Sequence, residues 1–163
     1  MENLEKPKIG IFVDVQNIYY TTRDAFNKPF NYRAFWKYME QQYDIQVANA
    51  YAIKRDQDDQ IKFQDALRHI GFDVKLKPWI QREDGSSKGD WDVGIALDVF
   101  EAASDLDKVI LLSGDGDFDM LLSRIRDRFE TISHVYSVDT LTADSLIEAA
   151  DEYTAIRPHL LMP

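Results

Sequence analysis

Residues 108–117 have the sequence KVILLSGDGD, an apolar run that passes directly into small and acidic residues. Four consecutive aliphatic residues are typical of a strand that is buried on both faces, as in a parallel sheet. The glycines that follow allow the backbone to turn tightly and to approach a ligand. This stretch therefore predicts a buried strand whose carboxyl end carries a loop rich in carboxylates.

Similar segments predict the rest of the sheet. Apolar, β-branched runs occur at residues 9–13, 47–53 and 132–138, with a weaker one at 72–76. Helical spacing of apolar residues is found at 32–43, 58–70, 91–103, 118–129 and 142–150. Alternating strands and helices favour an α/β fold with a mainly parallel sheet covered on both faces. Residues 82–89, rich in glycine, serine and charge, are expected to form a loop.

Length and composition limit the possible classes of protein. The 163 residues suit one domain, and 45% hydrophobic with 29% charged residues is an ordinary globular balance. The amino-terminal residues and the later apolar runs are too short or too charged for a signal peptide or a membrane span, so we expect a cytoplasmic protein. With no cysteine and three scattered histidines, any metal is expected to bind through carboxylates.

The net charge of −10 argues against a nucleic-acid partner, because a polyanion is repelled at long range. A local basic strip would weaken this objection. Residues 62–82 offer one, with Lys62, Arg68, Lys75, Lys77 and Arg82 against two acidic residues. We therefore expect any RNA to meet this strip while a cation neutralises the acidic residues.

Two pairs of polar residues follow predicted strands. Asp14 comes directly after residues 9–13, and Asn17 lies where a helix should begin. Helix capping explains Asp14 as well as a functional role does. Asp115 and Asp117 repeat this placement after residues 108–112. A turn needs only one of them, and two like charges at a strand end raise each other's pKa unless a cation intervenes. An EF-hand is excluded because its sixth position would be Met120.

A second acidic pair, Asp90 and Asp92, opens the predicted helix at 91–103. Asp90 is interpreted as its N-cap and Asp92 as a residue of its first turn, where the helix dipole favours a carboxylate. Asp98 falls about 240° further round this largely apolar helix, and so we expect it to need a specific partner. Trp91 and Tyr51, together with Trp79, offer surfaces for base stacking, although aromatic residues more often belong to the core.

If the carboxylates of Asp14, Asp92, Asp115 and Asp117 converge, an oxygen-only cluster suits Mg²⁺ or Mn²⁺ and metal-assisted hydrolysis of a phosphate ester. Asn17, Ser113 and Lys88 are the candidate substrate-binding residues, although Lys88 fits a solvated loop equally well. Walker A, dinucleotide-binding and nucleophile-elbow motifs are absent from the sequence. A haloacid-dehalogenase-type phosphatase would need a second aspartate where Gln16 stands.

Three segments carry a resemblance to a known family. They are IFVDVQN at residues 11–17, KGDWDV at 88–93 and SGDGDF at 113–118. In their order and spacing the chain resembles the NYN domains, and in particular the LabA-like group of the PIN-like nuclease superfamily. The resemblance covers nearly the whole chain.

The resemblance implies a three-layer α/β/α sandwich with strand order 3-2-1-4-5, which brings Asp14 and Asp115 onto neighbouring strand ends. It also implies a Mg²⁺- or Mn²⁺-dependent ribonuclease. We expect such an enzyme to cut single-stranded or unpaired RNA, which can enter a narrow carboxylate pocket. The metal-site roles fall on Asp14, Asp92, Asp115 and Asp117, and Asn17 supports them. Asp90 competes with Asp92 for the third position. A non-catalytic regulatory, nucleic-acid-binding or nucleotide-binding module is the alternative function, and a homodimer is a further expectation.

Overall fold

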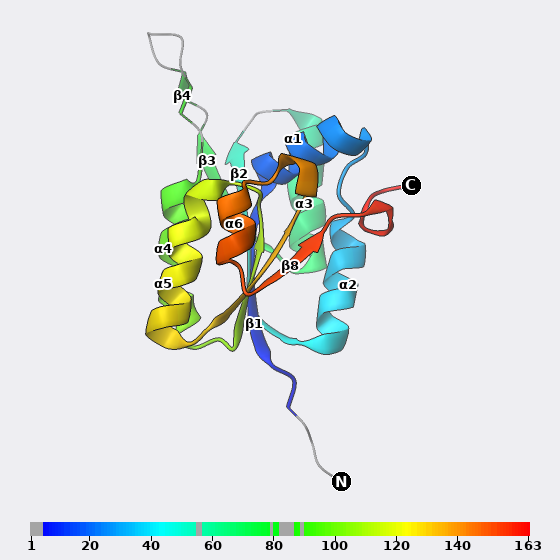
Figure 1. The fold of residues 1–163 in the computed structure, drawn as a ribbon. Coiled ribbons are helices and arrows are strands. Elements are labelled where there is room, and N and C mark those ends of the chain that lie inside the picture. Colours follow the sequence, from blue (N-terminus) through cyan, green and yellow to red (C-terminus); the bar gives the residue numbers. More distant parts are fainter. Residues whose placement is uncertain (1–4, 55–56, 79, 82–86, 89) are drawn as a thin grey trace.

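The computed structural model describes residues 5–54, 57–78, 80–81, 87–88 and 90–163. A six-stranded, all-parallel sheet runs through it in the order β3-β2-β1-β6-β7-β8. Its strands are β1 (Lys8–Asp14), β2 (Asp44–Lys54), β3 (Asp73–Pro78), β6 (Lys108–Leu112), β7 (Ile132–Ser137) and β8 (Glu152–Ala155). Two short strands, β4 (Ile80–Gln81) and β5 (Ser87–Lys88), pair with each other in antiparallel fashion, and Figure 1 shows β4 beyond the end of the sheet.

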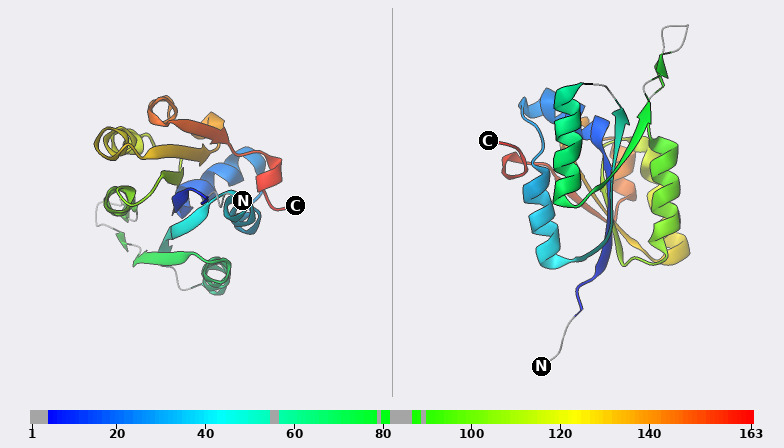
Figure 2. Two further views of the ribbon diagram at one scale, coloured as in Figure 1. Left: turned by 90° about the horizontal axis from the view of Figure 1, so that it is seen from below. Right: turned by 180° about the vertical axis from the view of Figure 1, so that it is seen from behind.

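Helices cover both faces of this sheet, as the end-on view in Figure 2 shows. They are α1 (Val15–Phe26), α2 (Tyr32–Gln42), α3 (Asp58–Ile70), α4 (Asp92–Ala103), α5 (Asp119–Phe129) and α6 (Asp144–Ala149). Three single-turn 3₁₀ helices, at Gly116–Phe118, Asp139–Leu141 and Pro158–Leu160, complete the connections. No described helix is long and apolar enough to cross a bilayer.

The core divides into two layers because successive side chains of a strand point to opposite faces. In β1, Ile9, Ile11 and Val13 pack with residues of α1, α2 and α3, whereas Phe12 packs with residues of α4, α5 and α6. All four β1 side chains are fully buried. The sheet is therefore covered on both faces, which is why its strands are nearly continuous apolar runs.

The predicted α/β/α sandwich and its strand order are confirmed, with β8 as an additional sixth strand at the edge. Five predicted strands and five predicted helices correspond to β1, β2, β3, β6 and β7 and to α2–α6, with ends that differ by up to three residues. The sequence predicts that a helix begins near Asn17, but it does not predict where α1 ends. Of the loop expected at 82–89, residues 87–88 pair as β5 with β4, and residues 82–86 and 89 lie outside the described part.

The chain direction places a switch point between β1 and β6. The strands β1, β2 and β3 follow one another towards one edge, and β6 then pairs with the other side of β1. Loops from β1 and β6 therefore leave in opposite directions at their carboxyl ends, which opens a crevice for a ligand. Asp14 ends β1, and Ser113 directly follows β6 at this crevice.

Candidate metal centre

Three carboxylates meet at the switch point. One oxygen from each of Asp14, Asp92 and Asp115 lies within 4.8 Å of the other two. Asp14 comes from the end of β1, Asp92 from the first turn of α4, and Asp115 from the loop after β6. Asp92, rather than Asp90, occupies the third position in the group. Within the described residues, this is the single group of acidic or histidine side chains arranged to hold one cation.

Hydrogen bonds hold Asp14 in place from two sides. The Ser113 hydroxyl donates to Asp14 Oδ2 at 3.1 Å, and the Asn17 backbone N–H lies 3.4 Å from Asp14 Oδ1. The second contact caps α1, so Asp14 has the structural role that its position allows and still faces the crevice. Asp14 is 9% exposed and is the least exposed of the three carboxylates.

The loop after β6 is ordered by the same groups. The Asp115 backbone N–H donates to Ser113 Oγ at 3.2 Å, and the Gly114 N–H donates to the side-chain oxygen of Asn17 at 2.9 Å. Gly114 lacks room for a side chain, because a Cβ there would lie 3.0 Å from the backbone oxygen of Leu141. Ser113 is fully buried, which favours a role in positioning Asp14 and Asp115 over direct contact with a substrate.

The structure places the other predicted site residues outside this group. Asp117 is exposed; its backbone N–H donates to Asp115 Oδ1 at 2.9 Å, and its side chain lines a groove between α4 and α5. Its metal-binding role therefore stays a prediction. The Lys88 side chain is not among those that the structure describes. Asp90 receives the Asp92 backbone N–H at 3.4 Å, the kind of contact expected of a residue that precedes a helix.

Electrostatics at the site favour a bound cation. The pKa of Asp14 is raised to about 6, mainly by burial and to a smaller extent by the Asp115 charge, against the hydrogen bonds from Ser113 and Asn17 that lower it. Burial and then the Asp115 charge raise the pKa of Asp92 to about 7. Three oxygen donors with this mutual repulsion suit a hard divalent ion such as Mg²⁺ or Mn²⁺. The donor set therefore fits the metal that the sequence predicts.

The start of α4, which carries Asp92, is fixed by the residue before it. The Trp91 indole N–H donates to the Ala52 carbonyl of β2 at 2.9 Å, and its ring lies 5.3 Å from the Tyr51 ring, centroid to centroid. The Lys77 ammonium lies 4.7 Å from the Trp91 ring centroid and donates to the Asp90 carbonyl at 3.1 Å. Sequence reasoning assigned Trp91 to stacking or to the core and missed this contact, because no local pattern links it to Ala52.

Asp98 has the partners that its position requires. The Tyr51 hydroxyl donates to Asp98 Oδ2 at 2.8 Å, and the Lys75 ammonium lies 3.2 Å from the same oxygen. The amide of Asn49 donates to the Tyr51 hydroxyl at 3.0 Å. This network joins α4 to β2 and β3, six residues along the helix from Asp92.

The predicted basic strip is partly neutralised. Lys75 pairs with Asp98, and Arg68 pairs with Asp65 at 2.9 Å. Lys77 keeps its charge but is held over the Trp91 ring. Arg82 and Trp79 lie outside the described residues. Among the residues that the structure does describe, the strip is therefore not a continuous cationic face.

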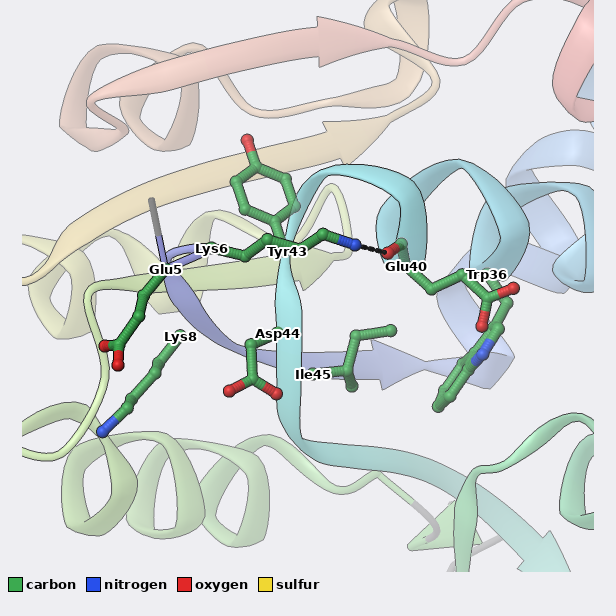
Figure 3. Close-up of a pocket in the computed structure, with 8 residues that line it drawn as sticks. All are labelled: Glu5, Lys6, Lys8, Trp36, Glu40, Tyr43, Asp44 and Ile45. Carbon is green, nitrogen blue, oxygen red and sulfur yellow. Dashed lines mark hydrogen bonds between the residues drawn. The ribbon is translucent and has the colours of Figure 1, made fainter. Parts of the chain in front are cut away.

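A second pocket lies at the opposite end of the sheet, where β1 and β2 begin (Figure 3). Its residues belong to the amino-terminal segment, α2 and the start of β2. Lys6 donates to the Glu40 backbone carbonyl at 3.0 Å, and the lining holds two lysines and three acidic residues. Its position separates it from the carboxylates at the switch point.

Comparison with known proteins agrees with this architecture. The NYN domain family model matches residues 8–157. The chain belongs to the NYN domain family. It is 30% identical over 154 residues to the low amplitude and bright protein LabA of Synechococcus elongatus, a match that covers 90% of this chain and 82% of LabA.

Solved structures give the same result. A crystal structure of a protein of unknown function from Vibrio parahaemolyticus is 49% identical, with a TM-score of 0.93 over 99% of this chain and 100% of that one. Ribokinase from Giardia lamblia, at 12% identity and a TM-score of 0.51, covers 92% of this chain and 58% of its own, and shares the fold alone. The family supports a nuclease-like or regulatory role for the acidic cluster.

Proposed function

We propose that the protein is a Mg²⁺- or Mn²⁺-dependent ribonuclease in which Asp14, Asp92 and Asp115 hold the metal. The observation that carries the proposal is the group of three carboxylate oxygens, each within 4.8 Å of the others, at the switch point of a parallel sheet. Structural stability alone does not call for such a group, because the mutual repulsion costs free energy. Membership of the NYN family supports RNA as the substrate.

The divalent ion, when bound, would lower the pKa of a coordinated water and stabilise the negative charge that develops on a phosphodiester. Asp14 and Asp115 would hold it through oxygens that Ser113 and the backbone N–H of Asp117 orient. Asp92 lies at the helix start on the other side and would complete the set or accept a proton from the attacking water.

Asn17 and the loop after β6 would position the substrate. The Asn17 side-chain oxygen is engaged by the Gly114 N–H, which directs its amide group away from that contact. An amide N–H is a suitable donor to a phosphate oxygen. Asp117, at the edge of the site, would orient Asp115 through its backbone N–H or contact the metal through a water. Because the three carboxylates converge at the switch point, where the loops after β1 and β6 diverge, we propose that the substrate is unpaired RNA, whose backbone can approach them singly.

A non-catalytic role is the second candidate, and the net charge of −10 favours it. In that case the same three carboxylates would bind a divalent ion or a metal–nucleotide complex as part of a regulatory module. Metal binding alone does not distinguish the two functions. Turnover of RNA does.

The deciding experiment measures cleavage of an unpaired RNA oligonucleotide by purified protein in Mn²⁺, in Mg²⁺ and in EDTA. We expect cleavage that needs the ion and that Asp115→Asn reduces by at least about 100-fold, since one metal ligand is lost. Asp117→Asn, which leaves the three-carboxylate group intact, should retain more activity than Asp115→Asn. Glu40→Gln, at an exposed residue of α2 near the opposite end of the sheet, serves as the matched charge control.

Equal rates for the parent and Asp115→Asn would reject the site. An ion that binds with no RNA turnover under any of these conditions would instead support the regulatory role.

A further inference from the structure

The outward faces of α4 and α5 form a groove that the acidic site does not use. The two helices lie side by side on the same face of the sheet in both figures that show the fold. The groove between them has a volume of about 850 Å³, and its floor includes Ala96 and Leu121. The rings of Phe100 and Phe129, whose centroids are 5.1 Å apart, join the two helices further along.

Several large apolar side chains on this face remain exposed in the folded chain. Val93, Leu97 and Met120 are 71%, 60% and 64% exposed, and Phe100 is 38% exposed. On α4 the residues 93, 97 and 100 share one stripe, because positions four and seven apart lie on the same side of a helix. Contiguous apolar side chains of this size on two neighbouring helices are typical of a protein–protein interface.

The charges around the groove indicate what covers it. Two arginines and two aspartates line it, Arg124, Arg128, Asp117 and Asp127, so the groove lining carries no net charge on a chain of net charge −10. A polyanion such as RNA would gain little here, because each cation is matched by an anion. Two copies of the chain, by contrast, repel each other least through a neutral face.

The groove is also suited to a two-fold interface. In such an interface the same patch appears on both sides and must be complementary to itself. A patch that contains both signs of charge beside an apolar stripe meets this condition, because arginines of one copy can face aspartates of the other. We propose that the α4–α5 groove is the surface through which two copies of this chain form a two-fold dimer.

The dimer would adjoin the acidic site without being part of it. Val93 follows Asp92, and Asp117 both lines the groove and donates its N–H to Asp115. The proposal concerns assembly and does not depend on ribonuclease activity. Its experiments therefore measure mass and cross-linking, which remain informative if no RNA is cut.

Light scattering coupled to gel filtration gives the mass in solution. We expect the parent to have about twice the chain mass of 18.9 kDa. Leu97→Glu and Met120→Glu should each halve the measured mass, because a charge on the stripe must be desolvated in the interface. Ile61→Glu, at a 48% exposed apolar residue of α3, is the matched control and should leave the mass unchanged. Circular dichroism melts check that each variant is folded.

Cross-linking provides the second measurement, and the absence of native cysteine makes it clean. Leu97→Cys should be joined into a covalent dimer by a bismaleimide cross-linker, whose spacer can link two thiols that do not lie on the two-fold axis. Ile61→Cys should stay monomeric under the same conditions. A parent that is monomeric at all concentrations, or a Leu97→Glu variant that stays dimeric, would overturn the proposal. If the parent is monomeric and Arg124→Glu or Leu97→Glu weakens binding of an RNA oligonucleotide, the groove is an RNA track instead.

Discussion

At the scale of single residues, the acidic cluster is held together against its own charge. Asp115 raises the pKa of both Asp14 and Asp92 beyond the effect of burial, and the hydroxyl of Ser113 only partly compensates at Asp14. In the metal-free protein the three carboxylates therefore destabilise the fold at neutral pH. Sites that sacrifice stability in this way are typically functional.

This repulsion predicts a stabilising substitution. Asp115→Asn removes one charge but keeps an oxygen to cap the turn at Asp117, since asparagine caps as well as aspartate. In EDTA at pH 8 we expect the free energy of unfolding to rise by about 1 kcal/mol, measured by urea denaturation. In saturating Mn²⁺ the order should reverse, because the parent gains more from the ion.

The pH dependence of this gain follows from the direction of the pKa shifts. Folding raises the pKa of Asp14 from 3.8 to about 6 and that of Asp92 from 3.8 to about 7. The folded protein thus holds more protons than the unfolded chain, so the stability from these groups is fully present below pH 3.8 and is lost as pH rises through 7. The advantage of Asp115→Asn should be small at pH 4 and largest at pH 8. A variant less stable than the parent in EDTA at pH 8 would show that repulsion is not the dominant effect.

At the scale of elements, the position of Asp92 depends on how α4 begins. The first backbone bond of the helix runs from the Ile95 N–H to the Trp91 carbonyl at 2.7 Å, and the Trp91 side chain is tied to β2. Gly94 leaves space for the indole, since a Cβ there would lie 2.6 Å from the ring. Trp91 is therefore a positioning residue for the third carboxylate.

We expect Trp91→Phe to weaken Mn²⁺ binding by about 10-fold, because outer contacts that orient a ligand typically contribute that much. Isothermal titration calorimetry measures this affinity directly. Trp36→Phe is the control, since Trp36 packs against Gly71 and Phe72 in a different layer. If both variants lose affinity equally, or if Trp91→Phe loses none, the anchoring of α4 does not set the metal site.

Elements differ in how far the sequence predicts them. Strand β6 is a strongly apolar run, and its predicted and observed limits coincide. Strand β8, Glu152–Ala155, has no such run, because an edge strand contributes few buried side chains, and its position depends on pairing with β7. Helix α1 buries only Val15, Ile18 and Thr22, with the threonine hydroxyl bonded to the Ile18 carbonyl. A buried threonine among only three buried residues weakens the apolar periodicity, so the sequence does not predict the extent of α1.

At the scale of the whole molecule, topology decides which aspartates meet. Asp14 and Asp115 lie 101 positions apart and come together because β1 and β6 are neighbours. The family resemblance predicts this strand order, and residue patterns alone do not. Asp117 lies within the one-turn 3₁₀ helix Gly116–Phe118 with an exposed side chain, and its metal-binding role stays a prediction.

The charge of the whole molecule limits how this acidic protein can bind RNA. With a net charge of −10 and much of the predicted basic strip already paired, long-range attraction is not available from the described residues. Binding must then depend on the cation at the carboxylates and on contacts near it. The proposed function therefore depends on whether these carboxylates bind a metal ion.

Diffraction from a crystal soaked in Mn²⁺ at neutral pH, recorded near the manganese absorption edge, tests directly whether the three carboxylates bind one ion. We predict an anomalous peak about 2 Å from an oxygen of each of Asp14, Asp92 and Asp115, and its loss in Asp115→Asn. A well-occupied Mn²⁺ elsewhere, or no peak at these carboxylates at concentrations that saturate binding in solution, would show that Asp14, Asp92 and Asp115 do not form the metal site.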